Sequence, residues 1–202
     1  MPIGAPVGSF LIAGVLKPLH LFARIKMNIL NNKSLLKDCA PDQTKYPAYG
    51  YVKIQVDDIR VGKIIAEINS GIGTKEIART KSQKQNLRKV KLWRIPVKSY
   101  TGETIKSLLP NINEVFNYKI CSLQDIQYLE YSNGDYYEWH SDIDNDLSSM
   151  RKISISLCLN GDYTGGNLEF FNDGQKVAIE TKKNDLIAFT SFLNHRVNKV
   201  RF

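Results

Sequence analysis

The sequence predicts an α+β fold in which helices precede an all-β core. An alternating run at 49–56 is followed by apolar residues at helical spacing over 61–68, and a second helical pattern covers 101–116. From residue 120 onward, short β-type runs alternate with turn signals up to the end of the chain. Helices followed by several short strands at regular spacing indicate an antiparallel sandwich or barrel.

The first predicted strand and helix follow from the spacing of apolar residues and from residues suited to cap a helix. Residues 49–56 (YGYVKIQV) alternate as a strand does, and Asp57 and Asp58 are suited to cap the helix that follows. That helix has one apolar face, formed by Val61, Ile64, Ile65 and Ile68. Residues 90–96 (VKLWRIP) again alternate. In the second helix, Pro110 predicts a kink or a break because proline lacks the N–H that the helix needs.

Length and composition favour one globular domain. The chain has 202 residues, of which 43% are apolar and 24% charged, so it can bury a sizeable core. Three widely spaced cysteines without a Cys-x-x-Cys pair argue against a disulfide scaffold and against a cysteine-ligated zinc site. A reducing compartment is the default for such a chain, so we expect a soluble cytoplasmic protein without a transmembrane segment.

The net charge of +8 is unevenly distributed. Residues 1–120 carry 20 Lys and Arg against 8 Asp and Glu, whereas residues 121–150 carry 7 acids and no Lys or Arg. The basic half suits nucleic acid or an acidic partner, or is simply a solvated surface. Acids clustered in such a chain suggest metal binding as readily as solubility.

The N-terminal stretch leaves several interpretations open. Residues 2–16 carry no charge, but the run is too short to span a bilayer and lacks the basic start of a secretory signal. Residues 17–30 are apolar and basic and suit an amphipathic helix, either at a membrane surface or packed on the domain. An overlong reading frame is the alternative, with Met27 as the true start. We expect residues 1–48 to form an extension and linker, and residues 49–202 to form the domain.

Two histidines and an aspartate form the strongest chemical pattern. His140 and Asp142 are two residues apart, so on a strand both side chains point to the same face. His195, on a predicted strand near the chain end, can complete a set of three ligands. Two histidines and one carboxylate on one face leave metal positions open, as in non-haem Fe(II) oxygenases. His-x-Asp alone is weak, since an isolated histidine is more often packed or solvated.

The surrounding motifs strengthen this interpretation, because their order resembles the Fe(II)/2-oxoglutarate-dependent dioxygenases of the prolyl 4-hydroxylase-like group. The matching positions run from 49 to the C-terminus and are dense from 126 to 200. They are Tyr131, Gly134 and Tyr137 before His140 and Asp142, Arg151 with the run to Leu159-Asn160, Gly165-Gly166 with Leu168 and Phe170, Asn184-Asp185 before an apolar strand, and His195-Arg196-Val197.

The resemblance implies a double-stranded β-helix, or jelly roll, with its core at 126–202 and flanking helices before it. It implies Fe(II) held by His140, Asp142 and His195, with 2-oxoglutarate as cosubstrate, O2 as oxidant and ascorbate as a further cofactor. It also implies that Tyr131 binds the cosubstrate. The expected reaction is hydroxylation of a C–H bond in a protein or peptide, with peptidyl proline as the substrate.

The sequence departs from the family near its end. Relatives carry an Arg or Lys roughly ten residues past the second histidine to bind the distal carboxylate of 2-oxoglutarate, whereas Phe202 lies only seven residues past His195. Lys199 and Arg201 share strand parity with His195, so either is a candidate replacement that faces inward. The closing strand of the jelly roll also looks incomplete.

Two other functions remain open at this stage. The absence of the Arg or Lys that binds 2-oxoglutarate favours a metal-binding jelly roll that serves as a binding module with impaired or lost catalysis. The basic run Arg79–Lys98, with eight Lys and Arg and no acid, favours a nucleic-acid demethylase on the same iron site. A solvated loop is the commoner explanation of such a run. Trp93, the one aromatic residue in the run, reads as strand core rather than as a base-stacking residue.

Overall fold

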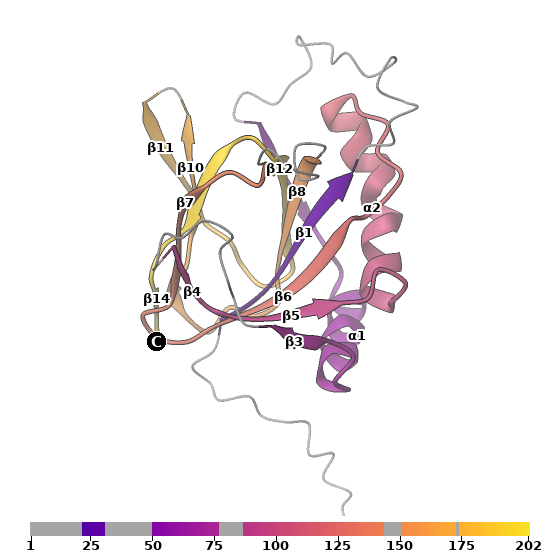
Figure 1. Cartoon of the computed structure of the whole chain (residues 1–202), viewed down its shortest axis with the longest axis horizontal. Helices are drawn as coiled ribbons and strands as arrows, with labels where there is room; N and C mark the ends of the chain where they lie inside the picture. The colour runs from indigo at the N-terminus through magenta and orange to yellow at the C-terminus, as the bar shows by residue number, and fades with distance from the viewer. Residues whose placement is uncertain (1–21, 31–49, 77–86, 144–150, 173) are drawn as a thin grey trace, which may run out of the picture.

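The described part of the protein consists of two packed β-sheets, one short strand pair and two helices (Figure 1). The computed structural model describes residues 22–30, 50–76, 87–143, 151–172 and 174–202. The larger sheet has seven strands in the order β2-β12-β8-β1-β6-β5-β3, and the smaller sheet has five in the order β11-β10-β13-β7-β4. Neighbouring strands run antiparallel in both sheets. The predicted α+β arrangement, with helices before most of the strands, is confirmed.

The strand bounds are as follows. The larger sheet contains β1 (Phe22–Leu30), β2 (Tyr51–Gln55), β3 (Thr74–Glu76), β5 (Lys91–Ile95), β6 (Asp125–Tyr131), β8 (Arg151–Cys158) and β12 (Asp185–Thr190). The smaller sheet contains β4 (Arg88–Lys89), β7 (Tyr136–His140), β10 (Leu168–Asn172), β11 (Gln175–Ile179) and β13 (Asn194–Val197). A separate pair joins β9 (Thr164–Gly165) to β14 (Val200–Arg201).

Both predicted helices form. The first, α1 (Asp58–Asn69), begins after Asp57, whose carboxylate accepts a hydrogen bond from the Arg60 N–H at 2.8 Å. The second, α2 (Tyr100–Phe116), continues through Pro110, so the predicted break is wrong. The helix persists because its apolar face, including Ile112 on the C-terminal side of the proline, is buried against the larger sheet.

The first strand corrects the prediction for the N-terminal region. Residues 22–30 form β1, which pairs with both β6 and β8 inside the larger sheet, so the amphipathic helix predicted over 17–30 is wrong for this part. The sequence there alternates strictly, with Arg24, Lys26 and Asn28 between apolar residues, and this is the period of a strand. Residues 17–21 lie outside the described residues. The domain boundary at residue 49 stays a prediction.

Two apolar clusters divide the interior. One lies between the helices and the outer face of the larger sheet and includes Ile64, Ile105, Ile112 and Ile155. The other lies between the two sheets and includes Tyr131, Phe170 and Phe189. The first cluster fastens the helices, and the second surrounds the space in which the candidate site lies. Within the described residues, no helix is both long enough and apolar enough to cross a membrane.

A carboxylate on α1 joins the two helices. Glu67 accepts hydrogen bonds from the Tyr100 N–H at 2.7 Å and the Thr101 N–H at 2.8 Å, and also from the Thr101 hydroxyl at 2.6 Å. These N–H groups belong to the first turn of α2, where a negative charge is favoured. Burial raises the pKa of Glu67, but the hydrogen bonds from Thr101 and Tyr100 outweigh it and leave this pKa below its ordinary value.

Candidate metal centre and its pocket

Adjacent strands of the smaller sheet bring the three predicted ligands together. His195 on β13 lies opposite His140 on β7 in the antiparallel register, and Asp142 follows two residues after His140. The next register pair joins Val197 to Tyr137, so β7 uses three steps where β13 uses two. This irregularity turns His140 and Tyr137 toward the same pocket, although strict alternation would separate them.

The ligand atoms are close enough for a single ion. The His140 Nε2 lies 3.5 Å from one carboxylate oxygen of Asp142, and the His195 Nε2 lies 3.6 Å from the other. One ligand atom from each of the three residues can be chosen so that all lie within 4.8 Å of one another. A metal about 2 Å from each donor requires separations of roughly 3 to 4 Å, so the arrangement fits.

Backbone carbonyls fix the orientation of both imidazoles. The Nδ1 of His140 lies 2.7 Å from the Glu138 carbonyl oxygen, and the Nδ1 of His195 lies 2.8 Å from the Leu193 carbonyl oxygen. A carbonyl oxygen only accepts, so each Nδ1 carries the hydrogen and donates it. In the neutral ring this leaves the Nε2 lone pair available for a metal.

Serines from the larger sheet hold the carboxylate. The Ser154 hydroxyl on β8 donates to Asp142 at 2.6 Å, and its oxygen lies 3.0 Å from the Ser191 hydroxyl. The Asp142 N–H donates to the Ser191 carbonyl at 2.9 Å, and Arg151 donates to the Asp142 carbonyl at 2.8 Å. The ligands therefore come from one sheet, whereas the group that orients the carboxylate comes from the other. Arg151, which also donates to the Gln124 side chain at 2.7 Å, therefore has a structural role.

A small, partly enclosed pocket lies beside the imidazoles. Tyr131, a predicted cosubstrate ligand, is fully buried and lines it, as do Ser156, Tyr137 and both histidines. The Ser156 hydroxyl is buried and makes no hydrogen bond to any described residue. A buried hydroxyl without a partner is costly, so this atom indicates the position of a polar ligand group.

The two basic residues predicted to replace the family's Arg or Lys do not face this pocket. Lys199 and Arg201 are exposed, whereas Val200 between them is fully buried, so the parity prediction is wrong. The reason is a change of partner: β13 ends at Val197, and β14 then pairs with β9 instead of β10. At that pairing Gly165 has a φ of +67° and no side chain, which leaves room for the Lys199 carbonyl oxygen. A Cβ at position 165 would lie 2.2 Å from that oxygen.

Sequence reasoning did not assign roles to the serines. Ser154 and Ser156 occur in the run ISISL, where two polar residues share one face of a buried strand. That pattern was the available signal, because a buried strand rarely carries two hydroxyls on one face without a polar neighbour. Trp139, the neighbour of His140, is half-buried on the outer face of the smaller sheet, where the Arg196 guanidinium lies 4.8 Å from its ring centroid.

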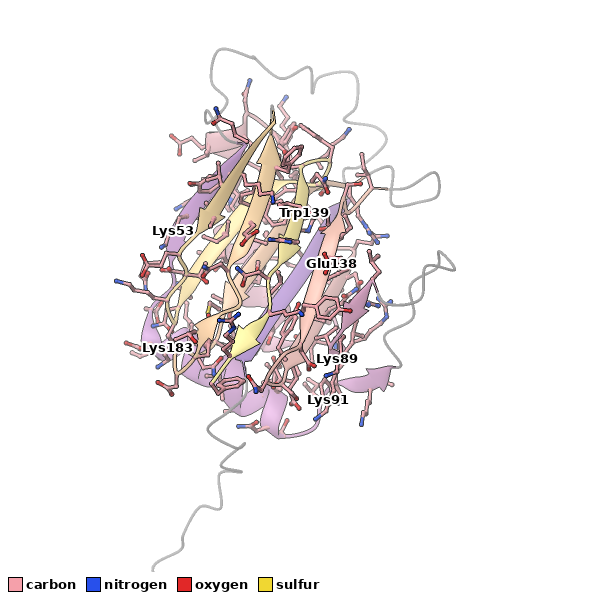
Figure 2. The ribbon with its side chains drawn as sticks, turned by 90° about the vertical axis from the view of Figure 1, so that its left-hand side faces the viewer. Lys53, Lys89, Lys91, Glu138, Trp139 and Lys183 are labelled. Atoms are coloured by element: carbon pink, nitrogen blue, oxygen red, sulfur yellow. The ribbon has the colours of Figure 1, made fainter. Side chains whose placement is uncertain are left out.

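The described part of the basic run is largely occupied by ion pairs. Lys89 pairs with Asp135 at 3.0 Å and Lys91 pairs with Glu130 at 2.9 Å, while Arg94 pairs with Asp125. Figure 2 shows Lys89 and Lys91 on the same side of the molecule. The residues from 77 to 86 lie outside the described part. These three cations bind acidic side chains of β6 and of the turn after it, which weakens the case for a nucleic-acid surface.

Comparison with known proteins finds a family for the C-terminal part of the chain. Residues 126–202 match the model of the 2OG-Fe(II) oxygenase superfamily. This match includes all three residues of the triad, so this part of the chain is similar to these non-haem iron dioxygenases, as the motifs predicted. The family implies Fe(II) and 2-oxoglutarate, and the donor set fits Fe(II). No curated protein matches the chain.

Solved structures confirm the predicted jelly-roll fold. A prolyl-4-hydroxylase from Pseudomonas putida matches with a TM-score of 0.57 and 20% identity, covering 84% of this chain and 92% of that one. A Trichoplax adhaerens prolyl hydroxylase, in complex with a hypoxia inducible factor peptide fragment, matches at 0.60 and 18%, covering 84% and 88%. A 2OG-Fe(II) oxygenase family oxidoreductase from Burkholderia pseudomallei matches at 0.58 and 12%, covering 76% and 80%.

Proposed function

We propose that the protein couples decarboxylation of 2-oxoglutarate to hydroxylation of a C–H bond in a polypeptide. The observation that carries this proposal is the orientation of the triad. His140 and His195 donate their Nδ1 hydrogens to carbonyls and turn both Nε2 atoms toward the Asp142 carboxylate. Two nitrogens and one oxygen on one side of an ion leave positions for a chelating cosubstrate and for O2.

The pocket suits the carboxylate end of 2-oxoglutarate. Ser156 has a buried hydroxyl without a hydrogen-bond partner among the described residues, and Tyr131 lines the same space. Hydroxyl donors bind carboxylates well in a site from which water is excluded. We assign the cosubstrate role to Tyr131 and Ser156, and we do not assign it to the exposed Lys199 and Arg201.

The chain itself performs three tasks in this proposal. Ser154 holds the Asp142 carboxylate in one orientation, and the carbonyls of Glu138 and Leu193 hold the two imidazoles. Phe189, whose ring lies edge-on to His195 at 4.7 Å, helps to exclude water from the histidines. Iron and 2-oxoglutarate, when bound, supply the oxidising power, because no protein side chain provides it.

Peptidyl proline is the proposed substrate. Two of the similar solved structures are prolyl hydroxylases, and one of them was determined with a peptide fragment. Fold similarity alone does not fix a substrate, so this assignment is a hypothesis that the next experiment tests. Ascorbate as a further cofactor and the cytoplasm as the compartment also remain predictions.

The test is a hydroxylation assay on proline-containing peptides. We expect mass spectrometry to detect the gain of one oxygen atom by the peptide, with succinate formed in equal amount, and to detect neither with His195→Ala. Iron binding without succinate formation from any peptide would favour the alternative, a metal-binding module without turnover. Oxidation of a methylated nucleic acid instead of peptides would favour the demethylase alternative.

A further inference from the structure

The strand β1 lies in the middle of the larger sheet, although it comes from the beginning of the chain. It runs between β6 and β8 and is antiparallel to both of them (Figure 1). Both neighbours contribute to the metal pocket, with Leu129 and Tyr131 on β6 and Ser156 on β8. The strand that joins these two parts of the pocket wall is therefore β1.

The register shows which residues of β1 belong to the pocket side of the sheet. Residues that pair directly across antiparallel strands share one face of a sheet. Arg24 pairs with Leu129 on β6, and Lys26 pairs with Ser156 on β8. Because Leu129 and Ser156 line the metal pocket, Arg24 and Lys26 belong to the face of β1 that borders this pocket.

Arg24 has the more central position of the two. Besides its direct partner Leu129, its diagonal neighbours on the same face are Tyr131 and Ser156. Diagonal neighbours lie about 7–8 Å apart, a distance that long side chains can bridge. Position 24 is therefore bordered by all three pocket residues described on β6 and β8, whereas Tyr131 is not a neighbour of position 26.

A pocket that holds a dicarboxylate needs a positive charge. Outside β1, the described residues that line the metal pocket offer hydroxyl, imidazole and apolar groups but no Lys or Arg. A carboxylate that is removed from water is costly unless a cation pairs with it. An arginine is well suited, because its planar guanidinium donates two parallel hydrogen bonds to one carboxylate. Lys199 and Arg201 are exposed, so neither meets this requirement.

We propose that Arg24 binds the distal carboxylate of 2-oxoglutarate, so that the first strand of the protein forms part of the cosubstrate site. This inference rests on the proposed function, because it takes 2-oxoglutarate as the ligand of the metal pocket. It assigns to a residue of β1 the task for which the resemblance predicted residues after His195. Binding of 2-oxoglutarate and pairing of β1 with its neighbours are then linked, and each stabilises the other.

The test compares 2-oxoglutarate with 2-oxopentanoate, which keeps the chain length and the chelating 2-oxo acid end but lacks the distal carboxylate. Binding of each to the full chain loaded with Mn(II) is measured by isothermal titration calorimetry. We expect the native protein to bind 2-oxoglutarate at least about tenfold more tightly than 2-oxopentanoate. In Arg24→Ala this preference should disappear, whereas the affinity for 2-oxopentanoate should stay unchanged.

The matched control is Lys26→Ala, which removes a cation from the same face of the same strand and should keep the preference. Arg24→Lys should keep part of it, because the charge remains and the two parallel hydrogen bonds are lost. Hydrogen exchange gives a measurement on the native protein alone. 2-Oxoglutarate should slow the exchange of the β1 amides in the Mn(II)-loaded protein more than 2-oxopentanoate does.

A native protein that does not prefer 2-oxoglutarate would overturn the inference, as would an Arg24→Ala variant that keeps the preference. Equal weakening of both ligands in Arg24→Ala would overturn it too, because Arg24 would then act only through the structure of β1. Loss of the preference in Lys26→Ala alone would transfer the role to Lys26 and contradict the assignment. Turnover plays no part in these measurements, so failure of the proposed reaction and failure of this inference are separate results.

Discussion

The two sheets of this protein use the same strand architecture for different purposes. The larger sheet buries isoleucines and leucines against α1 and α2, and among the described residues its outer face carries no candidate ligand. The smaller sheet places His140 and His195 side by side and exposes Phe171 on its outer face, where it packs on Trp139. One sheet therefore stabilises the fold, whereas the other presents chemistry that a stable fold does not require.

The sheets meet at the site. Ser154 and Ser156 belong to β8 of the larger sheet, yet one orients Asp142 and the other lines the pocket beside the histidines. Strand β8 therefore serves both regions, with Ile153 and Ile155 on its helix-facing side and the serines on the opposite side. Substitutions in the larger sheet should therefore mainly change stability, and substitutions in the smaller sheet should mainly change metal binding. Substitutions on β8 should affect both properties.

The largest expected effect comes from the larger sheet. Removal of residues 1–26, so that the chain starts at Met27, deletes Phe22–Lys26 and leaves less than half of β1. Because β1 lies between β6 and β8, the remaining strands lose ladder hydrogen bonds in the middle of the sheet. We expect loss of cooperative thermal unfolding, measured by circular dichroism. A shortened chain as stable as the full one would contradict the placement of β1.

The second effect is confined to the smaller sheet. His140→Ala should abolish Fe(II) binding, measured by anaerobic equilibrium dialysis, while the thermal midpoint changes little. The His140 side chain is only 9% exposed, but it lies at the end of β7 and outside both apolar clusters, so its truncation removes a ligand and little core packing. Iron affinity equal to that of the native protein would exclude this residue as a ligand. The variant His20→Ala removes a histidine that is not part of the triad and serves as the control.

A smaller effect is expected where the two regions join. Ser154→Ala removes the hydrogen bond to Asp142, so the carboxylate is less well oriented for the metal. Loss of such a supporting contact typically weakens metal affinity by about 10- to 100-fold. The same dialysis measures it, and Ser156→Ala is the matched control because its hydroxyl does not contact Asp142. Equal iron affinity in both serine variants would show that Ser154 does not orient the ligand.

The smallest effect lies at the helix pair. Glu67 has a lowered pKa, so its contribution to stability is complete above its ordinary value of 4.5 and is lost as the pH falls through the lower folded value. Glu67→Gln should reduce stability by about 1 kcal/mol near neutral pH, as loss of a helix cap does. On acidification the native protein should lose more of its thermal midpoint than the variant. Parallel pH profiles would contradict this account.

Spacing was enough to predict the two helices, and spacing together with the family motifs was enough to select His140, Asp142 and His195 as candidate ligands. His140 and Asp142 belong to one local segment, and the periodicity of α1 is local too, so neither needed knowledge of the fold. The positions of Lys199 and Arg201 failed because parity holds only within one strand, and the chain changes sheets between Val197 and Val200. The role of Ser154 depends on contact between the two sheets, which the sequence of β8 does not specify.

The strand β1 was missed for a related reason. Residues 17–30 taken together suit an amphipathic helix, whereas residues 23–29 alternate as a strand does, and pairing with β6 and β8 favours the strand. Those partners lie about a hundred residues or more away in the sequence. Long-range pairing, rather than local propensity, determined the outcome there.

The central claim is that one face of the smaller sheet binds Fe(II) and chelated 2-oxoglutarate together. Anaerobic titration with Fe(II) and then 2-oxoglutarate tests it most directly, through the visible charge-transfer absorption of the chelated cosubstrate. We expect this absorption in the native protein, its loss in His195→Ala, and a weaker 2-oxoglutarate affinity in Ser156→Ala. Fe(II) binding without the absorption, or no Fe(II) binding at all, would contradict the claim.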